Sequence, residues 1–240
     1  MRVFGKDFLM RVLVACERSG VVRQAFSAQG HDAWSCDLAP AEDRSNHHIV
    51  GDARGRLNDG WDLLMVAHPL CTRRCLSGLR WLYERDLWKD LDEAADLFST
   101  FWNAPIDRIA IENPIMHRHA KERIVNFQPA RQTLQPWQYG HGETKATCLW
   151  LKNLPPLLPT KIVEGREARV HRMPPSKNRA VERSRTFEGV AAAMATQWGT
   201  LNGPIDLFDF TWEPKQAVPS PRKATGEPDN YSLHRANCVL

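Results

Sequence analysis

The sequence contains no long apolar run. No hydrophobic stretch approaches the roughly 20 residues that a membrane-spanning helix needs, and the N-terminal residues lack the apolar core of a signal peptide. These absences predict a cytoplasmic protein with no membrane partner. The six cysteines lie mostly within or beside apolar segments and do not frame a small disulfide-bonded module, so reduced thiols are expected.

Two kinds of ligand-binding motif are missing as well. The three-glycine fingerprint of dinucleotide-binding proteins is absent, which disfavours a cofactor with a pyrophosphate. His68, Cys71 and Cys75 have spacings that resemble part of a zinc site, yet no second Cys/His pair lies nearby to complete a tetrahedral shell. The sequence therefore predicts no metal centre.

What the sequence does contain is an alternation of strands and helices. Over the first half of the chain, apolar runs of strand length are separated by segments with helical spacing. This order predicts a doubly wound, Rossmann-like α/β sheet of parallel strands joined by right-handed crossovers. The expected strands are 12–16, 33–36, 49–50, 62–67 and 108–112, and the expected helices are 20–29 and 81–103.

The second half differs in composition. Two further strands are expected at 135–139 and 147–151, joined through a turn at 140–142, and a helix is expected at 189–198. Residues 161–185 hold eight Lys or Arg against three Glu. Such a basic segment suits either contact with a phosphate backbone or a solvated surface loop.

The length of 240 residues suits one α/β domain with a small appended lobe. Residues 1–10 are expected to be an N-terminal extension, 11–212 the main domain and 213–240 a flexible tail. Within the main domain, about residues 153–185 are expected to form the small basic lobe.

Polar residues follow the ends of the first three expected strands. A tight turn leading into a helix is a common place to hold a nucleotide-like ligand. Carboxylates at the next two strand ends are suited to ribose hydroxyls and an adenine amino group. Each acidic residue alone also fits a helix cap or a turn, but the ordered set favours an adenosyl compound without phosphates. The candidate residues are Ala15, Cys16, Glu17, Arg18, Ser19, Gly20, Asp37, Leu38 and Asp52.

A cysteine and a glutamate follow two later strands. Cys71 lies between Pro69 and the pair Arg73 and Arg74, and arginines near a thiol favour the nucleophilic thiolate. Glu112 follows three apolar strand residues, so its charge must be solvated in a cleft or paired. The alternatives are an inert buried cysteine and a helix N-cap region. At one sheet edge, a thiolate and a carboxylate would suit attack on carbon 6 of a pyrimidine.

Three motifs, in this order and spacing, resemble those of the DNA (cytosine-5) methyltransferases, and more narrowly their compact phage-type members. The motifs are Cys16-Glu-x-Ser-Gly20, Pro69-x-Cys71 and Glu112-Asn113-Pro114. Residues 135–152, 183–186 and 193–199 also look like that family, so the resemblance covers about residues 11–199.

The resemblance implies a transferase that uses S-adenosyl-L-methionine as cofactor and DNA as partner, with residues 11–212 as its catalytic domain. Cys71 would add to carbon 6 of a flipped cytosine, and Glu112, with Asn113 beside it, would hold ring nitrogen 3 and the amino group. Carbon 5 would then take the methyl group. The family further implies a methyltransferase-type Rossmann-like sheet and a monomer in the cytoplasm of a bacterial host or a phage-infected cell.

The same resemblance assigns the cofactor site. Asp37 would hold the ribose, Asp52 the adenine and the 15–20 loop the methionine part, with Leu38 and Pro69 in the same site. In the family, an arginine motif on a strand follows the catalytic glutamate, and Lys145 and Thr147 take the nearest position here. The expected DNA contacts are Arg73, Arg74, Lys145, Thr147, Arg172, Arg183 and Arg185.

The sequence departs from the family pattern in three ways. Leu70 stands where a proline usually precedes the catalytic cysteine, and the first loop has Arg18 in place of an aromatic residue that packs on adenine. The large target-recognition domain is absent, so a short or relaxed recognition sequence is expected.

Three alternatives follow. The arginines at 18, 73 and 74 would suit carboxy-S-adenosyl-L-methionine and hence transfer of a carboxymethyl group. Leu70 is compatible with a non-catalytic DNA-binding protein that keeps the fold. A methyltransferase acting on an exocyclic nitrogen would need an Asp/Asn/Ser-Pro-Pro-aromatic motif after the fourth strand, where this chain has His68-Pro-Leu-Cys71.

Overall fold

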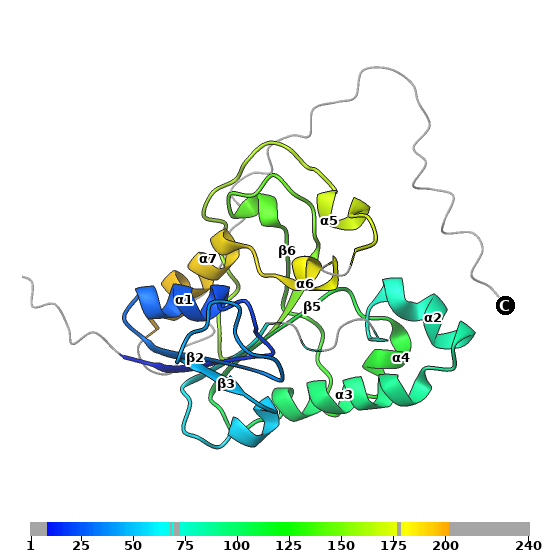
Figure 1. Ribbon diagram of the computed structural model, residues 1–240, viewed down its shortest axis with the longest axis horizontal. Coiled ribbons are helices and arrows are strands. Elements are labelled where there is room, and N and C mark those ends of the chain that lie inside the picture. Colours follow the sequence, from blue (N-terminus) through cyan, green and yellow to red (C-terminus); the bar gives the residue numbers. More distant parts are fainter. Residues whose placement is uncertain (1–8, 68, 70–72, 177–178, 202–240) are drawn as a thin grey trace, which may run out of the picture. The chain divides into compact units, whose positions relative to one another are not determined.

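The computed structural model describes residues 9–67, 69, 73–176 and 179–201. These residues form a seven-stranded sheet in the order β3-β2-β1-β4-β5-β7-β6 (Figure 1). The first five strands run parallel, whereas β7 is antiparallel to both of its neighbours, β5 and β6. The strands are β1 (Arg11–Ala15), β2 (Asp32–Asp37), β3 (His48–Val50), β4 (Leu63–Val66), β5 (Arg108–Asn113), β6 (Gln132–Leu134) and β7 (Thr147–Lys152). The prediction of a Rossmann-like, mostly parallel sheet is confirmed.

The central strands are apolar because both faces of the sheet are covered. Side chains alternate along a strand, so Val12 and Val14 of β1 enter one hydrophobic cluster while Leu13 and Ala15 enter the other. The apolar residues of β4 and β5 divide in the same way, and these apolar residues of the three strands are fully buried. The continuous apolar runs in the sequence thus correspond to strands in the middle of the sheet.

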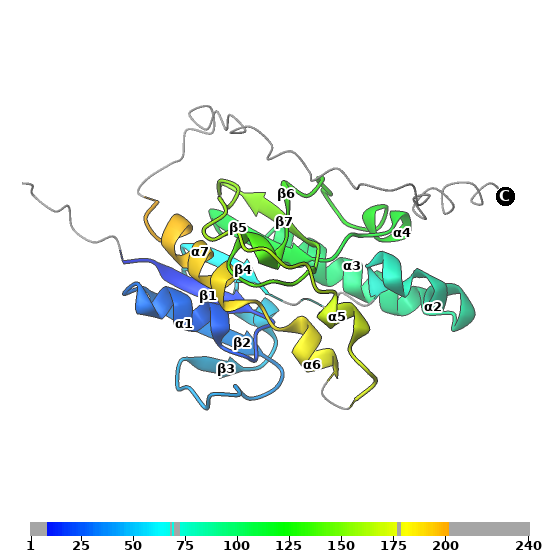
Figure 2. The same cartoon turned by 90° about the horizontal axis from the view of Figure 1, so that it is seen from above.

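Three helices supply most of the cover. α1 (Val21–Ala28) and α7 (Glu188–Trp198) lie side by side on one face, where Phe26 and Trp198 join the same cluster (Figure 2). α3 (Trp88–Trp102) packs on the other face through Leu91 and Phe98. The shorter helices are η1 (Ala53–Arg56), η3 (Leu76–Gly78), α2 (Leu79–Glu84), α4 (Arg118–Lys121), η4 (Pro136–Gln138), α5 (Arg169–Arg172) and α6 (Arg179–Ser184).

Two predicted elements are wrong in detail. The single helix expected at 81–103 is two helices, α2 and α3, because the chain turns at Asp86, whose φ is 50°. The strand expected at 135–139 is instead β6 at Gln132–Leu134 followed by η4. Pro136 suits the first turn of a helix because it has no amide hydrogen to leave unbonded, and Gln135 and Gln138 form a capping box around it.

All described residues belong to one compact unit within residues 1–207. The basic segment is tied to the rest of the chain by bridges from Tyr139 to Lys161 and from Glu143 to Glu167. The expected tail at 213–240 and most of the expected extension at 1–10 lie outside the described residues. Within the part of the chain that is described, no helix has the length and apolarity to cross a membrane.

Candidate active site

The carboxyl ends of the parallel strands meet at one edge of the sheet. β1 is followed in the chain by β2 on one side, but β4 pairs with β1 on the other side, so the strand order reverses between β1 and β4. Open α/β sheets bind ligands at such a reversal, beyond the carboxyl ends of the strands. Cys16, Asp37 and Glu112 all lie at these strand ends, as the sequence predicted.

A cavity of about 290 Å³ lies beyond the ends of β1 and β2. It contains four of the predicted cofactor residues, which come from three separate segments of the chain. The lining residues are Cys16, Cys36, Asp37, Leu38, Gly51, Asp52, Ala53, Arg54, Leu97 and Phe101.

The two large apolar residues that α3 contributes to this cavity were not predicted from the sequence. Leu97 and Phe101 are four residues apart on α3 and therefore share one face of that helix. Phe101 supplies an aromatic ring at the cavity, although the first loop has none. The helical spacing of α3 was visible in the sequence, but it did not show which ligand site the helix would meet.

The two carboxylates of the cavity differ in their partners. Asp37 Oδ1 accepts a hydrogen bond of 2.9 Å from the amide of Ala39. Asp52 caps η1 and holds the Arg54 guanidinium, with Nε 2.8 Å and Nη2 2.6 Å from Oδ2. The bonds from Arg54 keep the pKa of Asp52 below its ordinary value. Asp52 is therefore both a cap and a wall of the cavity.

The loop at 15–20 is built mainly to start α1. Glu17 is fully buried, and its carboxylate accepts the amides of Val22 at 2.7 Å and Arg23 at 3.2 Å. Gly20 precedes the helix with a φ of 74°, a conformation that glycine adopts without strain. Of the six residues predicted in this loop, Cys16 alone is among the lining residues of the 290 Å³ cavity.

The cysteines in the cavity are poor nucleophiles. Burial, with a further contribution from Asp37, raises the pKa of Cys16 to about 12. Burial also raises the pKa of Cys36 to about 11. Both thiols are therefore protonated at neutral pH, and the thiolate is the reactive form.

The predicted nucleophile, Cys71, lies outside the described residues, as do Leu70 and Thr72. The neighbours on either side are described. Arg73 pairs with Asp90, with Nε 3.0 Å from Oδ2. Arg74 is fully buried and its guanidinium donates to the carbonyls of Pro69 and Ala94. Arg74, predicted to contact DNA, thus packs against α3 with its side chain away from the surface.

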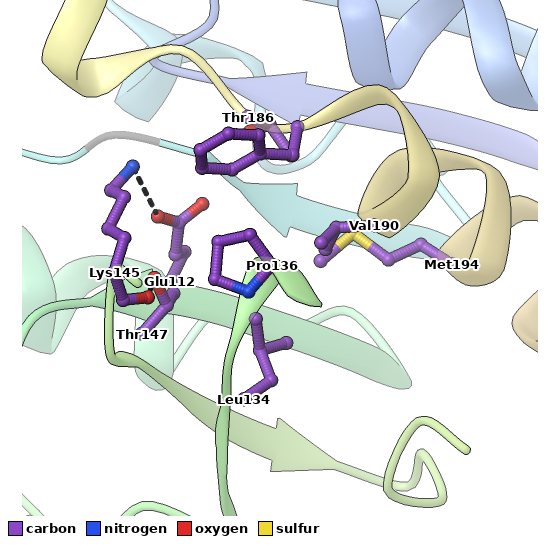
Figure 3. Close-up of a pocket in the computed structure, with 9 residues that line it drawn as sticks. Glu112, Leu134, Pro136, Lys145, Thr147, Thr186, Val190 and Met194 are labelled. Carbon is purple, nitrogen blue, oxygen red and sulfur yellow. Dashed lines mark hydrogen bonds and ion pairs between the residues drawn. The ribbon is translucent and has the colours of Figure 1, made fainter. Parts of the chain in front are cut away.

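Glu112 lies at the end of β5 in a second, much smaller pocket (Figure 3). Its Oε1 is 3.8 Å from Lys145 Nζ, and the Thr186 hydroxyl hydrogen-bonds to its carboxyl group. Burial raises the pKa of Glu112, and Lys145 and Thr186 partly oppose that rise. The pocket is lined by Glu112, Leu134, Pro136, Lys145, Thr147, Thr186, Phe187, Val190 and Met194.

This pocket brings together residues that the sequence had assigned separately. Lys145 and Thr147, expected to contact DNA, lie beside the catalytic candidate Glu112. Asn113 is buried and donates from Nδ2 to the carbonyl of Pro114 at 2.7 Å, so it shapes the turn after β5. The free volume is about 10 Å³, roughly the space for one water molecule. A larger ligand therefore requires the side chains to move apart.

The remaining predicted DNA contacts lie on the basic segment. Arg172 on α5 is exposed, and Arg183 on α6 is partly exposed. Arg185 pairs with Glu42, a residue of the loop after β2. These arginines come from the short helices α5 and α6 and the turn that follows, which the sequence showed as a region without a regular period.

Fold and cavities together define a Rossmann-like α/β protein with a cavity at the carboxyl ends of its strands. No protein-family model matches the chain, and no curated protein matches its sequence. In the described part of the chain, no three or more His, Cys, Asp or Glu side chains are grouped to hold a metal ion.

Proposed function

We propose that the protein transfers a methyl group from S-adenosyl-L-methionine to carbon 5 of cytosine in DNA, with Cys71 as the covalent nucleophile. The observation that carries this proposal is the buried Glu112, placed with Lys145 and Thr186 at the same sheet edge as the Asp37 cavity. The motifs in the sequence support the same assignment, because the first follows β1 and the third begins at the end of β5, both of which are parallel strands.

The larger cavity suits an adenosyl group without phosphates. Its carboxylates, Asp37 and Asp52, can accept hydrogen bonds from ribose hydroxyls or an amino group, and the Arg54 guanidinium in the same cavity is already paired with Asp52. Phe101 and Leu97 offer apolar surface for a purine ring. The antiparallel β7, inserted between β5 and β6, also departs from the strand order of dinucleotide-binding sheets.

The smaller pocket suits a pyrimidine held by its edge. Burial favours the protonated form of Glu112, which can donate a hydrogen bond to ring nitrogen 3 and accept one from the amino group. Lys145 and Thr186 also present donors there. A cytosine must leave the duplex to reach such a pocket. Because the pocket is closed around about 10 Å³, base entry requires residues such as Lys145 or Phe187 to move.

The chemistry follows from these roles. The Cys71 thiolate forms a bond to carbon 6, and the electron pair of the 5,6 double bond is stabilised by the hydrogen bond from Glu112 to nitrogen 3. A cofactor held in the Asp37 cavity would supply the electrophilic methyl group that carbon 5 takes, and its sulfur would leave as a neutral thioether. Loss of the carbon-5 proton to a base then restores the double bond and expels the Cys71 thiolate.

Nucleoside mass spectrometry tests the proposal. Purified protein is incubated with DNA and S-adenosyl-L-methionine, and the DNA is digested and analysed. The expected product is 5-methylcytosine, which should disappear with Cys71→Ser and persist with Cys75→Ser, a matched control at a neighbouring buried cysteine. Full activity of Cys71→Ser would contradict the proposed mechanism. A lack of product with the wild type would favour a non-catalytic DNA-binding protein.

The carboxymethyl alternative lacks support from its three arginines, since Arg18, Arg73 and Arg74 are all missing from the lining of the 290 Å³ cavity. Arg73 is paired with Asp90, and Arg74 is buried against backbone carbonyls. Neither is among the residues that line the 290 Å³ cavity. The same experiment with carboxy-S-adenosyl-L-methionine in place of the methyl donor tests this alternative. The product would then be 5-carboxymethylcytosine, which differs in mass from 5-methylcytosine.

A further inference from the structure

We propose that Arg74 and His117 are positioning residues that hold the backbone on the two sides of Cys71. The inference rests on the function proposed above, because that function makes Cys71 the nucleophile. Cys71 lies outside the described residues, but Pro69 precedes it by two positions and Arg73 follows it by two. The Pro69 carbonyl is held by Arg74 of the same segment, and the Arg73 carbonyl is held by His117, which follows β5.

Arg74 holds the backbone on the N-terminal side of Cys71. Its Nη2 donates to the Pro69 carbonyl at 3.0 Å, and its Nη1 donates to the Ala94 carbonyl, in the middle of α3, at 3.2 Å. The guanidinium also lies over the Phe98 ring, 5.1 Å from its centroid. A fully buried guanidinium is costly unless its donors are well bonded. Here those bonds join Pro69, which precedes Cys71 by two positions, to α3.

His117 holds the backbone on the C-terminal side of Cys71. Its Nε2 is 2.7 Å from the Arg73 carbonyl, and its Nδ1 is 3.2 Å from the Ala120 amide. A carbonyl only accepts and an amide only donates, so the ring must be neutral, with its proton on Nε2. The side chain is buried. His117 thus caps α4 with Nδ1 and holds the Arg73 carbonyl, on the C-terminal side of Cys71, with Nε2.

Backbone hydrogen bonds join the segment after Cys71 to the segment after Glu112. Together with the contacts of Arg74 and His117, they form what is called here the clamp. The His117 amide donates to the Arg74 carbonyl at 3.1 Å, and the Leu76 amide donates to the Ile115 carbonyl at 3.0 Å. Between them, Cys75 and Met116 form an antiparallel bridge. The segment after Cys71 and the segment after Glu112 are therefore joined by two backbone hydrogen bonds and one isolated antiparallel bridge.

Two substitutions at His117 separate positioning from simple structural support. His117→Asn keeps an acceptor at the place of Nδ1 for the α4 cap but has no donor that reaches Arg73. His117→Gln has a donor at the reach of Nε2 but loses the cap. We expect His117→Asn to lower kcat about 10- to 100-fold with the KM for the methyl donor changed less than about twofold, and His117→Gln to keep most activity.

Hydrogen–deuterium exchange of the peptide covering 69–76 provides a readout that does not need turnover. Exchange should be faster than in the wild type for His117→Asn and for Arg74→Lys, which keeps the charge but loses one donor arm, and unchanged for His117→Gln. Wild-type exchange and kcat in His117→Asn would overturn the proposal. So would equal losses of activity in both His117 variants. If the wild type makes no 5-methylcytosine, the proposed function fails, while exchange still decides whether the clamp exists.

Discussion

Lys145 Nζ lies 3.8 Å from Glu112 Oε1, and both side chains are largely shielded from solvent. Shielding disfavours each charge alone, while the neighbouring opposite charge favours it. For Glu112 the effect of burial is the larger one, and its pKa is raised. Lys145 therefore controls how far the carboxyl group of Glu112 remains protonated as the pH rises.

Lys145→Met should move the alkaline limb of the kcat/KM profile to higher pH. Removing the cation takes away an effect that lowers the pKa of Glu112, so the protonated carboxyl group needed at ring nitrogen 3 persists further. Lys145→Arg keeps the positive charge and should retain the wild-type profile. Rates of methyl transfer measured between pH 6 and 10 check this. An unchanged limb in Lys145→Met would argue against Glu112 as the protonated group.

Asp37→Asn should weaken cofactor binding. Hydrogen bonds to a charged group contribute about 1.5–3 kcal/mol, so the KM for S-adenosyl-L-methionine should rise about 10- to 100-fold with a smaller change in kcat. Asp32→Asn is a matched control, because Asp32 begins the same strand at its opposite end and is not among the cavity residues. Equal KM values for the two variants would remove Asp37 from the cofactor site.

Glu17→Gln should change how stability depends on pH. Burial raises the folded-state pKa of Glu17 from 4.5 to about 7, even though two amides donate to it. The folded state therefore binds this proton more tightly, and the associated stability is present below pH 4.5 and lost as the pH rises through about 7. The full loss is up to about 3 kcal/mol.

Urea unfolding at several pH values between 5 and 8 measures this effect. Glutamine does not ionise, so the free energy of unfolding of the wild type should fall relative to Glu17→Gln as the pH rises. A difference between the two proteins that stays constant across this range would show that Glu17 keeps the same protonation state throughout.

Gly189→Ala should destabilise the wall of the Glu112 pocket. Gly189 lies on α7 between the lining residues Phe187 and Val190, and a Cβ there would overlap the carbonyl oxygen of Tyr139. Overpacking of this kind costs about 1–3 kcal/mol, more than the gain in helix propensity. Gly55→Ala, where a Cβ would meet open space, is the matched control and should be nearly neutral. Thermal unfolding compares the two, and equal melting temperatures would contradict the prediction.

Most strands and the long helices were predictable because their signals are local. Val12–Cys16 and Arg108–Glu112 are short apolar runs, and Gly189–Trp198 has helical spacing, so each is close in extent to an element of the structure. The errors at 81–103 and 135–139 also have local causes, in the turn at Asp86 and in the first-turn preference of Pro136. These features were present in the sequence but are weaker than the hydrophobic pattern.

The sequence by itself determined that Asp37 and Glu112 end parallel strands, and that such ends face one crevice. Only the tertiary structure decided which other side chains lie beside Asp37 and Glu112. Phe101 reaches the Asp37 cavity from α3, Lys145 and Thr186 reach Glu112 from segments far along the chain, and Arg74 turns inward. The reason is physical: strand periodicity depends on neighbours in the sequence, whereas these contacts depend on how distant segments pack.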